Sequence, residues 1–324
     1  MIKPRITIVG LGFIGGSIGL ALHQAEGDIE VVGHDRERSA ATQARKIGAV
    51  DKTDWNLISA CEDADLIVMA TPVGAIQDTL KVIAPYLKAG CLITDTATSK
   101  VQVVKWAEEI LPEGVHFVGG DPVVGDGGGA GIDAARADLF SRAIYCLTPA
   151  ASAAPDAVRL ASDFVSVLGA VPYFLDPQEH DGLMAGVDHL PFVLSAALLG
   201  ITTESATWRE MRKLAGGVFE GATGFASADP MAYRDACLVN SENIVRWIDA
   251  YSGRLAELRE TILARDSEKL GQVFEDVLIA RQRWLKARAE GNWEGQQSME
   301  VPTMGSFMGQ LFGLGRLTKR RKQE

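Results

Sequence analysis

The chain has 324 residues, of which 47% are hydrophobic and 23% are charged, and its formal net charge is -10 at pH 7. This length predicts a globular protein of about two domains, and the acidic balance argues against an overall nucleic-acid-binding surface. The sequence has neither a run of about eighteen apolar residues nor the regions of a signal peptide, so we expect a cytoplasmic protein. The cysteines lack metal-binding spacing and are expected to be small core residues.

The chain opens on a strand, a glycine-rich turn and a helix, in that order. The β-branched run 6–9 precedes glycines in the spacing G-x-G-x-x-G, and an apolar helical segment, 17–23, follows them. This is the dinucleotide-binding fingerprint: the first glycine allows the tight turn, the second lets a pyrophosphate approach the backbone, and the third lets helix and strand pack closely. The helix N-terminus offers free N–H groups to the phosphates. The predicted cofactor contacts in this turn are Gly10, Gly12, Phe13, Ile14 and Gly15.

A second predicted strand, 29–33, is followed by an acidic residue and nearby arginines. Asp35 lies where a carboxylate accepts hydrogen bonds from the ribose hydroxyls of NAD and repels the 2′-phosphate of NADP. Its alternative role is to cap the helix that follows. Arg36 is a further predicted cofactor contact, and together with Arg38 it supports the alternative in which a phosphate is held. We predict NAD as the cofactor.

Strands and helices alternate through the rest of the first half. An apolar strand at 64–70 runs into Thr71, Pro72 and Val73. We predict that these three residues contact the cofactor, because ligands of open α/β sheets bind at the carboxyl ends of the strands. Three more strands are predicted at 91–94, 115–118 and 143–147. The alternation predicts an α/β fold with a doubly wound parallel sheet of the Rossmann type, in an NAD-binding domain of residues 1–152.

After this domain the apolar residues recur at helical spacing. Helices are predicted at 158–168, 178–201, 207–219, 230–249 and 254–289, the last broken near Asp266. The segment 153–290 is therefore predicted to be an all-α dimerisation and substrate domain, since its apolar surplus favours burial against a second subunit. A self-contained bundle is the alternative. Residues 291–324 form a tail with apolar and basic residues. For this tail, packing on the protein itself or remaining without fixed structure is favoured over contact with a membrane or a partner.

Several short motifs follow one another in a fixed order. They are V-G-L-G-F-I-G-G-S (9–17), D-A-D-L-I-V-M-A-T-P-V (63–73), I-T-D-T-A-T-S-K (93–100), F-V-G-G-D-P (117–122), E-H-D (179–181), D-H-L-P (188–191) and A-S-A-D-P (226–230). In these motifs the chain, over residues 5–290, resembles the prephenate and arogenate dehydrogenases of tyrosine biosynthesis. The resemblance implies a Rossmann domain followed by a helical dimerisation domain. It also implies an oxidative decarboxylation, in which hydride leaves the hydroxyl-bearing ring carbon for the nicotinamide, a base accepts the hydroxyl proton, and loss of carbon dioxide gives an aromatic ring.

The resemblance also places candidate catalytic residues. The family's catalytic histidine lies in G-G-H-P, where this chain has Asp121, and the serine that polarises the same hydroxyl becomes Thr98. An ordinary aspartate is a poor base at neutral pH unless burial raises its pKa. In the family segment S-H-L-P-H, the serine becomes Asp188 and His189 is retained. We predict Asp121, Thr98, His189 and Asp188 as the catalytic residues.

Two further changes fall where the family binds its substrate. The last histidine of S-H-L-P-H is Phe192 here, and the arginine of T-R-I-A-S, which binds a substrate carboxylate, is Gly224. An acidic pocket without this arginine repels a dicarboxylate such as prephenate, and arogenate, which carries an amine, suits it better. The first hypothesis is therefore a dehydrogenase of prephenate or arogenate. The alternatives are an NAD-dependent dehydrogenase of another neutral or cationic hydroxyl-bearing substrate, and an NAD-binding protein without turnover.

Several polar residues keep two interpretations. His180 and Asp181 lie at a helix start, where capping explains them as well as catalysis does. Lys100 either steadies an anion or points to solvent. No metal is predicted: Asp121, Asp126, Asp188 and His189 are possible ligands, but a solvated turn is the favoured interpretation of Asp126.

Overall fold

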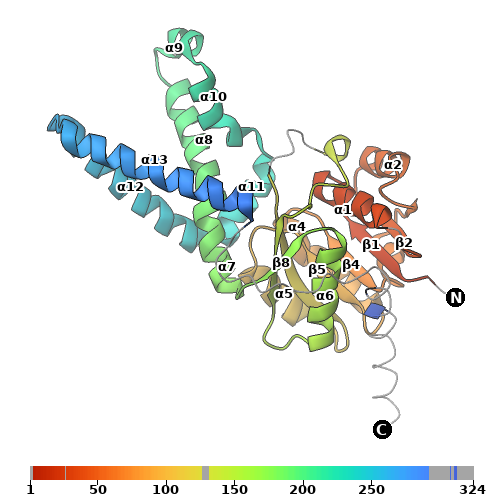
Figure 1. Cartoon of the computed structure of the whole chain (residues 1–324). Coiled ribbons are helices and arrows are strands. Elements are labelled where there is room, and N and C mark those ends of the chain that lie inside the picture. The colour runs from red at the N-terminus through yellow and green to blue at the C-terminus, as the bar shows by residue number, and fades with distance from the viewer. Residues whose placement is uncertain (1–2, 26, 126–130, 292–306, 308–309, 312–324) are drawn as a thin grey trace. The chain divides into compact units, whose positions relative to one another are not determined.

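The computed structural model describes residues 3–25, 27–125, 131–291, 307, 310 and 311 (Figure 1). Within them the chain forms two compact units. The first comprises the described residues of Met1–Ser241 and of Val301–Glu324, and the second comprises those of Glu242–Glu300.

The first unit is built on one eight-stranded sheet, with strand order β3-β2-β1-β4-β5-β6-β7-β8. The strands are β1 (Arg5–Val9), β2 (Glu30–His34), β3 (Lys52–Thr53), β4 (Leu66–Met69), β5 (Leu92–Asp95), β6 (His116–Val123), β7 (Ile144–Pro149) and β8 (Val171–Phe174). All neighbouring strands are parallel except β6 and β7. The Rossmann-type doubly wound sheet predicted from the sequence is thus confirmed.

The sheet differs from the prediction at its β7–β8 edge. β7 runs antiparallel to β6, because the described part of their connection holds only the single turn η2 (Ile132–Ala134) and no crossover helix. β8 was not predicted: it is short, mostly exposed and contains Pro172, as an edge strand tolerates. The sheet therefore extends past the boundary predicted at residue 152, as far as Phe174.

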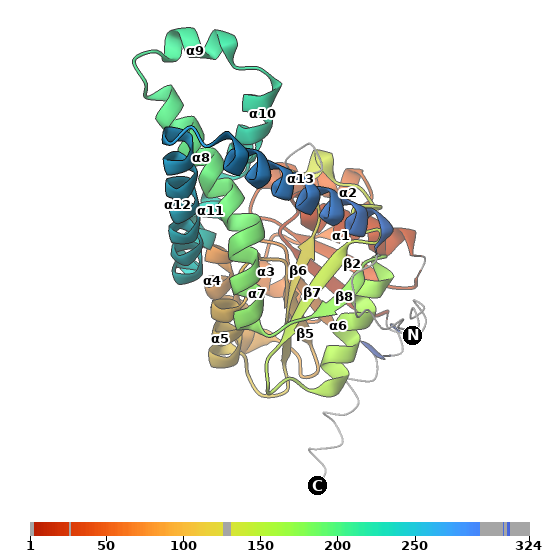
Figure 2. The same ribbon diagram turned by 60° about the vertical axis from the view of Figure 1, so that its left-hand side comes forward.

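Helices cover both faces of this sheet (Figure 2). They are α1 (Phe13–Gln24), α2 (Arg38–Lys46), α3 (Leu57–Cys61), α4 (Val73–Ile83), α5 (Val101–Ile110) and α6 (Pro155–Val167), with the 3-10 turn η1 (Ala84–Tyr86). The side chains of β4 show why two cores form: Leu66 and Val68 belong to one cluster, and Ile67 and Met69 belong to the other. Successive strand residues point to opposite faces, so an all-apolar strand feeds both cores.

Part of the predicted C-terminal tail belongs to the first core. Phe307 is fully buried, with its ring 6.3 Å from that of Phe164 on α6, and Leu311 is buried in the same cluster. Gln310 donates a hydrogen bond to Asp163 on the same helix. The other residues of the tail, including its basic end, lie outside the described residues.

The rest of the first unit is helical. Its elements are α7 (Pro177–Met184), the π-helical turn η3 (Ala185–His189), α8 (Leu190–Thr203), α9 (Trp208–Leu214), α10 (Gly217–Thr223), the 3-10 turn η4 (Gly224–Ser227) and α11 (Pro230–Val239). Figure 1 shows α8 leading away from the sheet, with α9 and α10 at its far end. The predicted helix 207–219 is interrupted before Gly217, and the predicted helix 230–249 is interrupted at Asn240.

The π-helical turn follows from one residue. Pro191 has no N–H to donate to the carbonyl of Val187, and its ring clashes with a regular helix at that point. The helix widens for one turn instead, as it often does at functional sites. As a result Asp188 and His189, neighbours in sequence, both face inward, with His189 fully buried and the Asp188 side chain 30% exposed.

The continuous helix Pro177–Thr203 is also long and apolar enough to cross a membrane, judged by length and composition alone. It contains buried His180, Asp181 and His189, whose polar atoms bond to other elements of the first unit. A helix that packs against a second subunit meets the same two criteria. The bonds of these three residues show that this part of the helix packs within the first unit.

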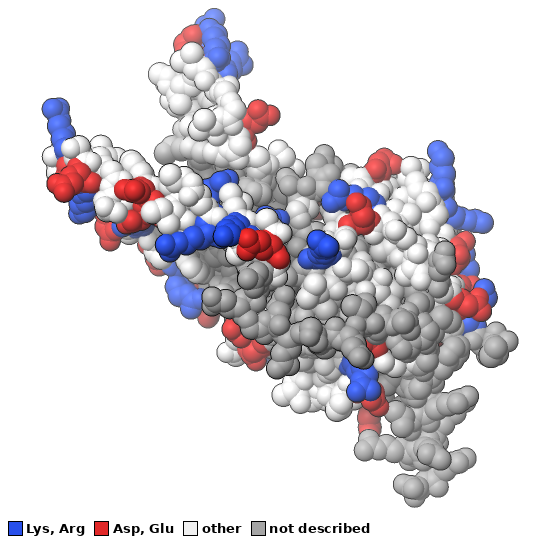
Figure 3. Space-filling view, viewed as in Figure 1, with Lys and Arg blue, Asp and Glu red and all other residues white. Residues whose placement is uncertain are grey.

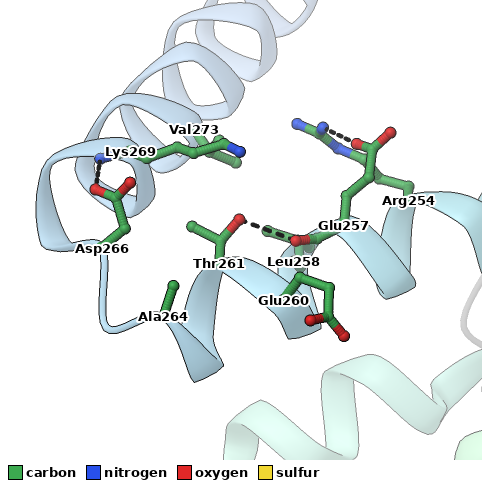
Figure 4. A pocket seen from close by; sticks show the side chains of 9 residues that line it. All are labelled: Arg254, Glu257, Leu258, Glu260, Thr261, Ala264, Asp266, Lys269 and Val273. Atoms are coloured by element: carbon green, nitrogen blue, oxygen red, sulfur yellow. Dashed lines mark hydrogen bonds and ion pairs between the residues drawn. The ribbon is translucent and has the colours of Figure 1, made fainter.

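The second unit consists of the helices α12 (Ser241–Leu263) and α13 (Ser267–Glu290). Asp266 separates them and accepts a hydrogen bond from the Lys269 N–H at 3.0 Å, which confirms the break predicted there. A cavity of about 430 Å³ opens between the two helices (Figure 4). Its lining mixes charged and apolar residues: Arg254, Glu257, Leu258, Glu260, Thr261, Ala264, Asp266, Lys269 and Val273. None of the predicted site residues lines it.

Both helices of the second unit keep large apolar side chains exposed. They include Leu255, Ile262, Leu263, Phe274, Val277, Leu278 and Trp284. Acidic and basic residues lie interspersed between them on the face shown in Figure 3. Exposed apolar residues of this number on two helices are typical of a surface that packs against another subunit.

Candidate active site

The glycine-rich turn between β1 and α1 has the geometry that a dinucleotide requires. Gly10 has φ +95°, and a Cβ there would lie 2.4 Å from the Ala70 carbonyl oxygen. A Cβ on Gly15 would lie 1.9 Å from the Gly10 carbonyl oxygen, whereas a Cβ on Gly12 would meet no atom within 4 Å. The first and third glycines are therefore needed by the fold. The second leaves open space at the start of α1, beside the N–H groups of Phe13 and Ile14.

Asp35, at the end of β2, holds this turn in shape. Its carboxylate accepts one hydrogen bond from the Leu11 N–H and one from the Glu37 N–H, both at 2.7 Å. Each oxygen keeps a free lone pair for a ribose hydroxyl, so capping and ribose binding are compatible. Arg36 is exposed and lies 4.0 Å from Glu37, and Arg38 stacks over Trp55 at 4.8 Å. These contacts give no indication that either arginine holds a phosphate. They therefore do not favour NADP over NAD.

The predicted contacts after β4 lie beside the same turn. The Thr71 side chain lies 3.0 Å from the position of a Gly10 Cβ, and its hydroxyl oxygen is buried without a hydrogen-bond partner among the described residues. Pro72 precedes α4, and Val73 is its first residue. A hydroxyl that is free to bond, beside the glycine-rich turn, fits the polar edge of a nucleotide.

Replacing Gly12 tests this arrangement. We expect Gly12→Ala to weaken NAD binding at least about tenfold, because the methyl group fills the space where the pyrophosphate approaches. Since that space is open, the free energy of unfolding should change by less than about 1 kcal/mol. Titration calorimetry with NAD and a denaturant titration measure the two effects. Gly221→Ala, also in open space but on α10, is the matched control and should leave NAD affinity unchanged.

A buried ion pair joins the ends of β5 and β6. Lys100 and Asp95 are both fully buried, and the Lys100 ammonium donates to the Asp95 carboxylate and, at 2.7 Å, to the Gly120 carbonyl oxygen. Asp95 also accepts hydrogen bonds from the N–H groups of Gly120 and Ala97 at 3.1 and 3.0 Å. Burial raises the pKa of Asp95, and the Lys100 charge opposes that rise. Lys100 therefore neither reaches solvent nor is free for a ligand anion.

A row of buried charged groups crosses the site. His180 is fully buried, and it donates from Nε2 to Asp121 and from Nδ1 to Asp181, both at 3.0 Å. Burial disfavours its charge, but the bonds to the two carboxylates outweigh burial and raise the pKa of His180 to about 11. Asp181 accepts hydrogen bonds from the N–H groups of Lys100 and Val101 at 2.5 and 3.0 Å. It thus caps α5 rather than its own helix.

A second histidine lies next to the predicted hydroxyl residue. His189 Nε2 is 3.0 Å from Thr98 Oγ1, and its Nδ1 is 3.4 Å from the side-chain amide of Asn240. Burial lowers the pKa of His189, the His180 charge adds to this, and Asp121 and Asp181 oppose it. His189 is therefore a neutral imidazole at pH 7, hydrogen bonded to a hydroxyl.

An acidic and aromatic corner adjoins the two histidines. Asp188 accepts a hydrogen bond from the Tyr233 hydroxyl at 3.4 Å, and the rings of Tyr233 and Phe192 stack at 3.8 Å. Burial and the charge of Asp121 raise the pKa of Asp188 to about 6, against the effect of Tyr233. The predicted catalytic residues Asp121, Asp188 and His189 thus lie within electrostatic reach of one another.

The sequence identified these catalytic candidates but not the hydrogen bonds that they make. Tyr233 and Asn240, both near the ends of α11, were missed altogether, and no motif marks them. The sequence left the role of His180 open between helix capping and catalysis. Its hydrogen bond to Asp121 makes it part of the site. The described residues hold no group of His, Cys, Asp and Glu able to bind a metal ion, and Asp126, an alternative ligand, lies outside the described residues.

Comparison with known proteins decides the family. The nucleotide-binding domain of prephenate dehydrogenase matches residues 18–174, and the dimerization domain of prephenate dehydrogenase matches residues 176–276. The prephenate dehydrogenase of Bacillus subtilis (strain 168) is 31% identical over 278 residues, which cover 84% of this chain and 74% of the relative. The chain belongs to the prephenate dehydrogenase family.

Solved structures of prephenate dehydrogenase family members agree with this fold. The prephenate dehydrogenase of A. aeolicus, in complex with hydroxyphenyl propionate and NAD+, matches with a TM-score of 0.81 at 26% identity, over 87% of this chain and 99% of that chain. Synechocystis arogenate dehydrogenase matches with a TM-score of 0.71 at 25% identity, over 86% of this chain and 99% of that chain. The Rossmann domain and the helical dimerisation domain predicted from the sequence are those of the family.

Several polar residues of the site stand where the sequence resemblance places other residue types. Asp188 and Phe192 both contact Tyr233, Asp121 contacts His180, and Gly224, where the resemblance places an arginine, begins the 3-10 turn η4. The cofactor half of the site thus matches the family fingerprint, and the departures gather around Asp188.

Proposed function

We propose that this protein is an NAD-dependent dehydrogenase of tyrosine biosynthesis, which oxidises and decarboxylates prephenate or arogenate. The observation that carries this function is the pair Thr98–His189, a neutral imidazole bonded to a hydroxyl at the carboxyl edge of a sheet with an open dinucleotide turn. The family match supports the same reaction, since the relatives named above are prephenate and arogenate dehydrogenases.

The residues of the glycine turn fit NAD. The open space at Gly12 and the N–H groups of Phe13 and Ile14 would hold the pyrophosphate, Asp35 the ribose, and Thr71 the polar edge of the cofactor. When bound, NAD supplies the hydride acceptor. The A. aeolicus relative with NAD+ supports the same cofactor for this chain.

Thr98 and His189 take the hydroxyl proton in this proposal. The substrate O–H bond breaks and its proton passes to Thr98 Oγ1, whose own proton passes to His189 Nε2. NAD, when bound, would accept the hydride from the same carbon, and the substrate oxygen would then be a ring carbonyl. Loss of carbon dioxide returns an electron pair through the ring to the oxygen, which recovers the proton from His189. A neutral histidine suits this exchange because its free ring nitrogen can accept a proton at pH 7.

Asp121 and His180 have a supporting role in this proposal. The Asp121 carboxylate is already engaged by the protonated His180, and Asp181 fixes the other side of that imidazole. Asp121 thereby places a negative charge near His189, which stabilises the imidazolium formed when His189 accepts the proton. Asp121 stays a predicted catalytic residue, but through charge rather than as the first proton acceptor.

The match to the family's dimerization domain and the exposed apolar residues of α12 and α13 support a homodimer. The relatives named above support a small-molecule substrate, and we propose that the enzyme acts in the cytoplasm. A dehydrogenase of an unrelated substrate and an NAD-binding protein without turnover, the other two hypotheses from the sequence, are not favoured by these comparisons.

A coupled measurement of NADH and carbon dioxide tests the function. With NAD and millimolar prephenate or arogenate, we expect one carbon dioxide released for each NADH formed with at least one of the two substrates. Because Asp35 faces the ribose, NADP should support the reaction at least about tenfold less well. No NADH with either substrate would contradict the proposed function.

A further inference from the structure

Asp188 has a carboxylate oxygen that nothing in its surroundings satisfies. Its Oδ2 atom is buried and has no hydrogen-bond partner among the described residues, while Oδ1 has only the long bond from Tyr233. His189 Nε2 lies 3.7 Å from Oδ2, beyond hydrogen-bond distance, and His189 is neutral. A buried charged oxygen left unpaired costs free energy unless a ligand pairs with it.

Among the described residues that interact with Asp188, none supplies a free positive charge. Asp121 adds a second negative charge, and the protonated His180 is already shared between Asp121 and Asp181. The family arginine is replaced by Gly224. At pH 7 the Asp188 carboxylate is ionised, since its pKa is about 6. The site therefore favours a ligand that carries a positive charge over one that carries none.

We propose that Asp188 binds an ammonium group of the substrate, so that the enzyme selects the amino acid arogenate over the keto acid prephenate. This inference rests on the proposed function, and it names the substrate within it. The two compounds differ at this point by an ammonium group in place of a ketone. An ammonium can donate to Asp188 Oδ2 in a charge-assisted hydrogen bond, which a ketone oxygen cannot do.

The stacked rings next to Asp188 favour the same ligand. Tyr233 and Phe192 lie face to face at 3.8 Å with an angle of 5° between their planes. The outer face of an aromatic ring attracts cations, and a phenylalanine has no hydrogen-bond donor for a carboxylate. Phe192 and Asp188 thus both favour a substrate with a positive charge.

Steady-state kinetics of one variant tests the proposal. In the wild-type enzyme we expect kcat/KM for arogenate to exceed that for prephenate by at least about 100-fold, as a desolvated charge pair would give. Asp188→Ser, which restores the family residue, should lower kcat/KM for arogenate by about 100-fold, mainly through KM. It should raise kcat/KM for prephenate, because a carboxylate that a keto acid cannot pair with is removed. Thr98 and His189 are untouched, so kcat for arogenate should stay within several-fold.

The matched control is Asp63→Asn, which removes the same charge from an exposed residue that precedes β4, at the amino edge of the sheet. It should leave the ratio of the two kcat/KM values unchanged. Equal losses for both substrates in Asp188→Ser would mean a structural role and would overturn the proposal. A wild-type enzyme that prefers prephenate would overturn it as well.

A binding measurement separates this proposal from the proposed function. Tyrosine and 4-hydroxyphenylpyruvate, the two aromatic products, differ by the same ammonium group and need no turnover. In the presence of NAD, calorimetry should show tighter binding of tyrosine, and Asp188→Ser should abolish that difference. Tyrosine selectivity without turnover of either substrate would sink the proposed reaction and keep the ammonium site. Turnover without tyrosine selectivity would overturn the ammonium site and keep the proposed reaction.

Discussion

Replacing His189 by glutamine is expected to lower kcat by about 100- to 10,000-fold with little change in KM. Glutamine keeps a polar atom near Thr98 Oγ1 but cannot accept a proton, so the hydroxyl of the substrate loses its base. The variant should fold, because the amide can still bond to Thr98 or Asn240. Single-turnover measurement of NADH formation gives the rate of the chemical step.

The pH profile adds a second readout to this prediction. The neutral form of His189 is the active one, so wild-type kcat should rise with pH through the lowered pKa of His189, that is, below 6.5, and then level off. The groups that surround this histidine are Thr98, His180, Asp121, Asp181, Asp188 and Asn240. The acid limb should disappear in His189→Gln. Thr98→Ser, which keeps the hydroxyl, is the control and should retain both rate and limb. If Asp121→Asn alone removed the limb, Asp121 and not His189 would be the base.

Replacing Lys100 by methionine is expected to destabilise the protein by about 3–5 kcal/mol. Methionine fills a similar volume, but it leaves the fully buried carboxylate of Asp95 without its cation, and an unpaired buried charge is among the most destabilising changes known. The Gly120 carbonyl also loses a donor. The free energy of unfolding from denaturant titration measures the effect.

The pH dependence of the Lys100→Met variant identifies the cause. Burial already raises the pKa of Asp95, and without Lys100 the rise is larger. The folded state then binds a proton that the unfolded state releases near pH 4, so stability should fall as the pH rises from about 5 to 8. Lys105→Met, at an exposed position of α5, is the matched control and should cost less than about 0.5 kcal/mol. Equal losses in Lys100→Met and in the double variant with Asp95→Asn would show that the charge is not the reason.

The first half of the fold could be predicted from local sequence patterns. The glycine spacing around Gly12 and the all-apolar strand β4 depend on contacts that sequence neighbours largely determine. The antiparallel β7 and the edge strand β8 were missed because strand direction depends on what connects the strands. An exposed edge strand also lacks the apolar run by which buried strands are recognised.

The sequence predicted which residues belong to the site. It did not predict the hydrogen bonds between them. Thr98 and His189 are 91 positions apart in sequence, and His180 and Asp121 are 59 apart. A motif can mark each of them, but no spacing tells which carboxylate an imidazole will meet after folding. The sequence also could not tell that Lys100 pairs with Asp95 rather than faces solvent. This depends on burial, which is a property of the whole fold.

The π-helical turn at Pro191 separates two tasks that adjacent residues perform. In a regular helix, residues 188 and 189 point in directions about 100° apart, and a change of size at one disturbs the packing of the other. Here the widened turn is fixed by the proline ring, so its pitch does not depend on the side chain at position 188. If the two proposals above hold, we therefore expect an exchange of residue 188 to change the substrate preference while His189 stays beside Thr98.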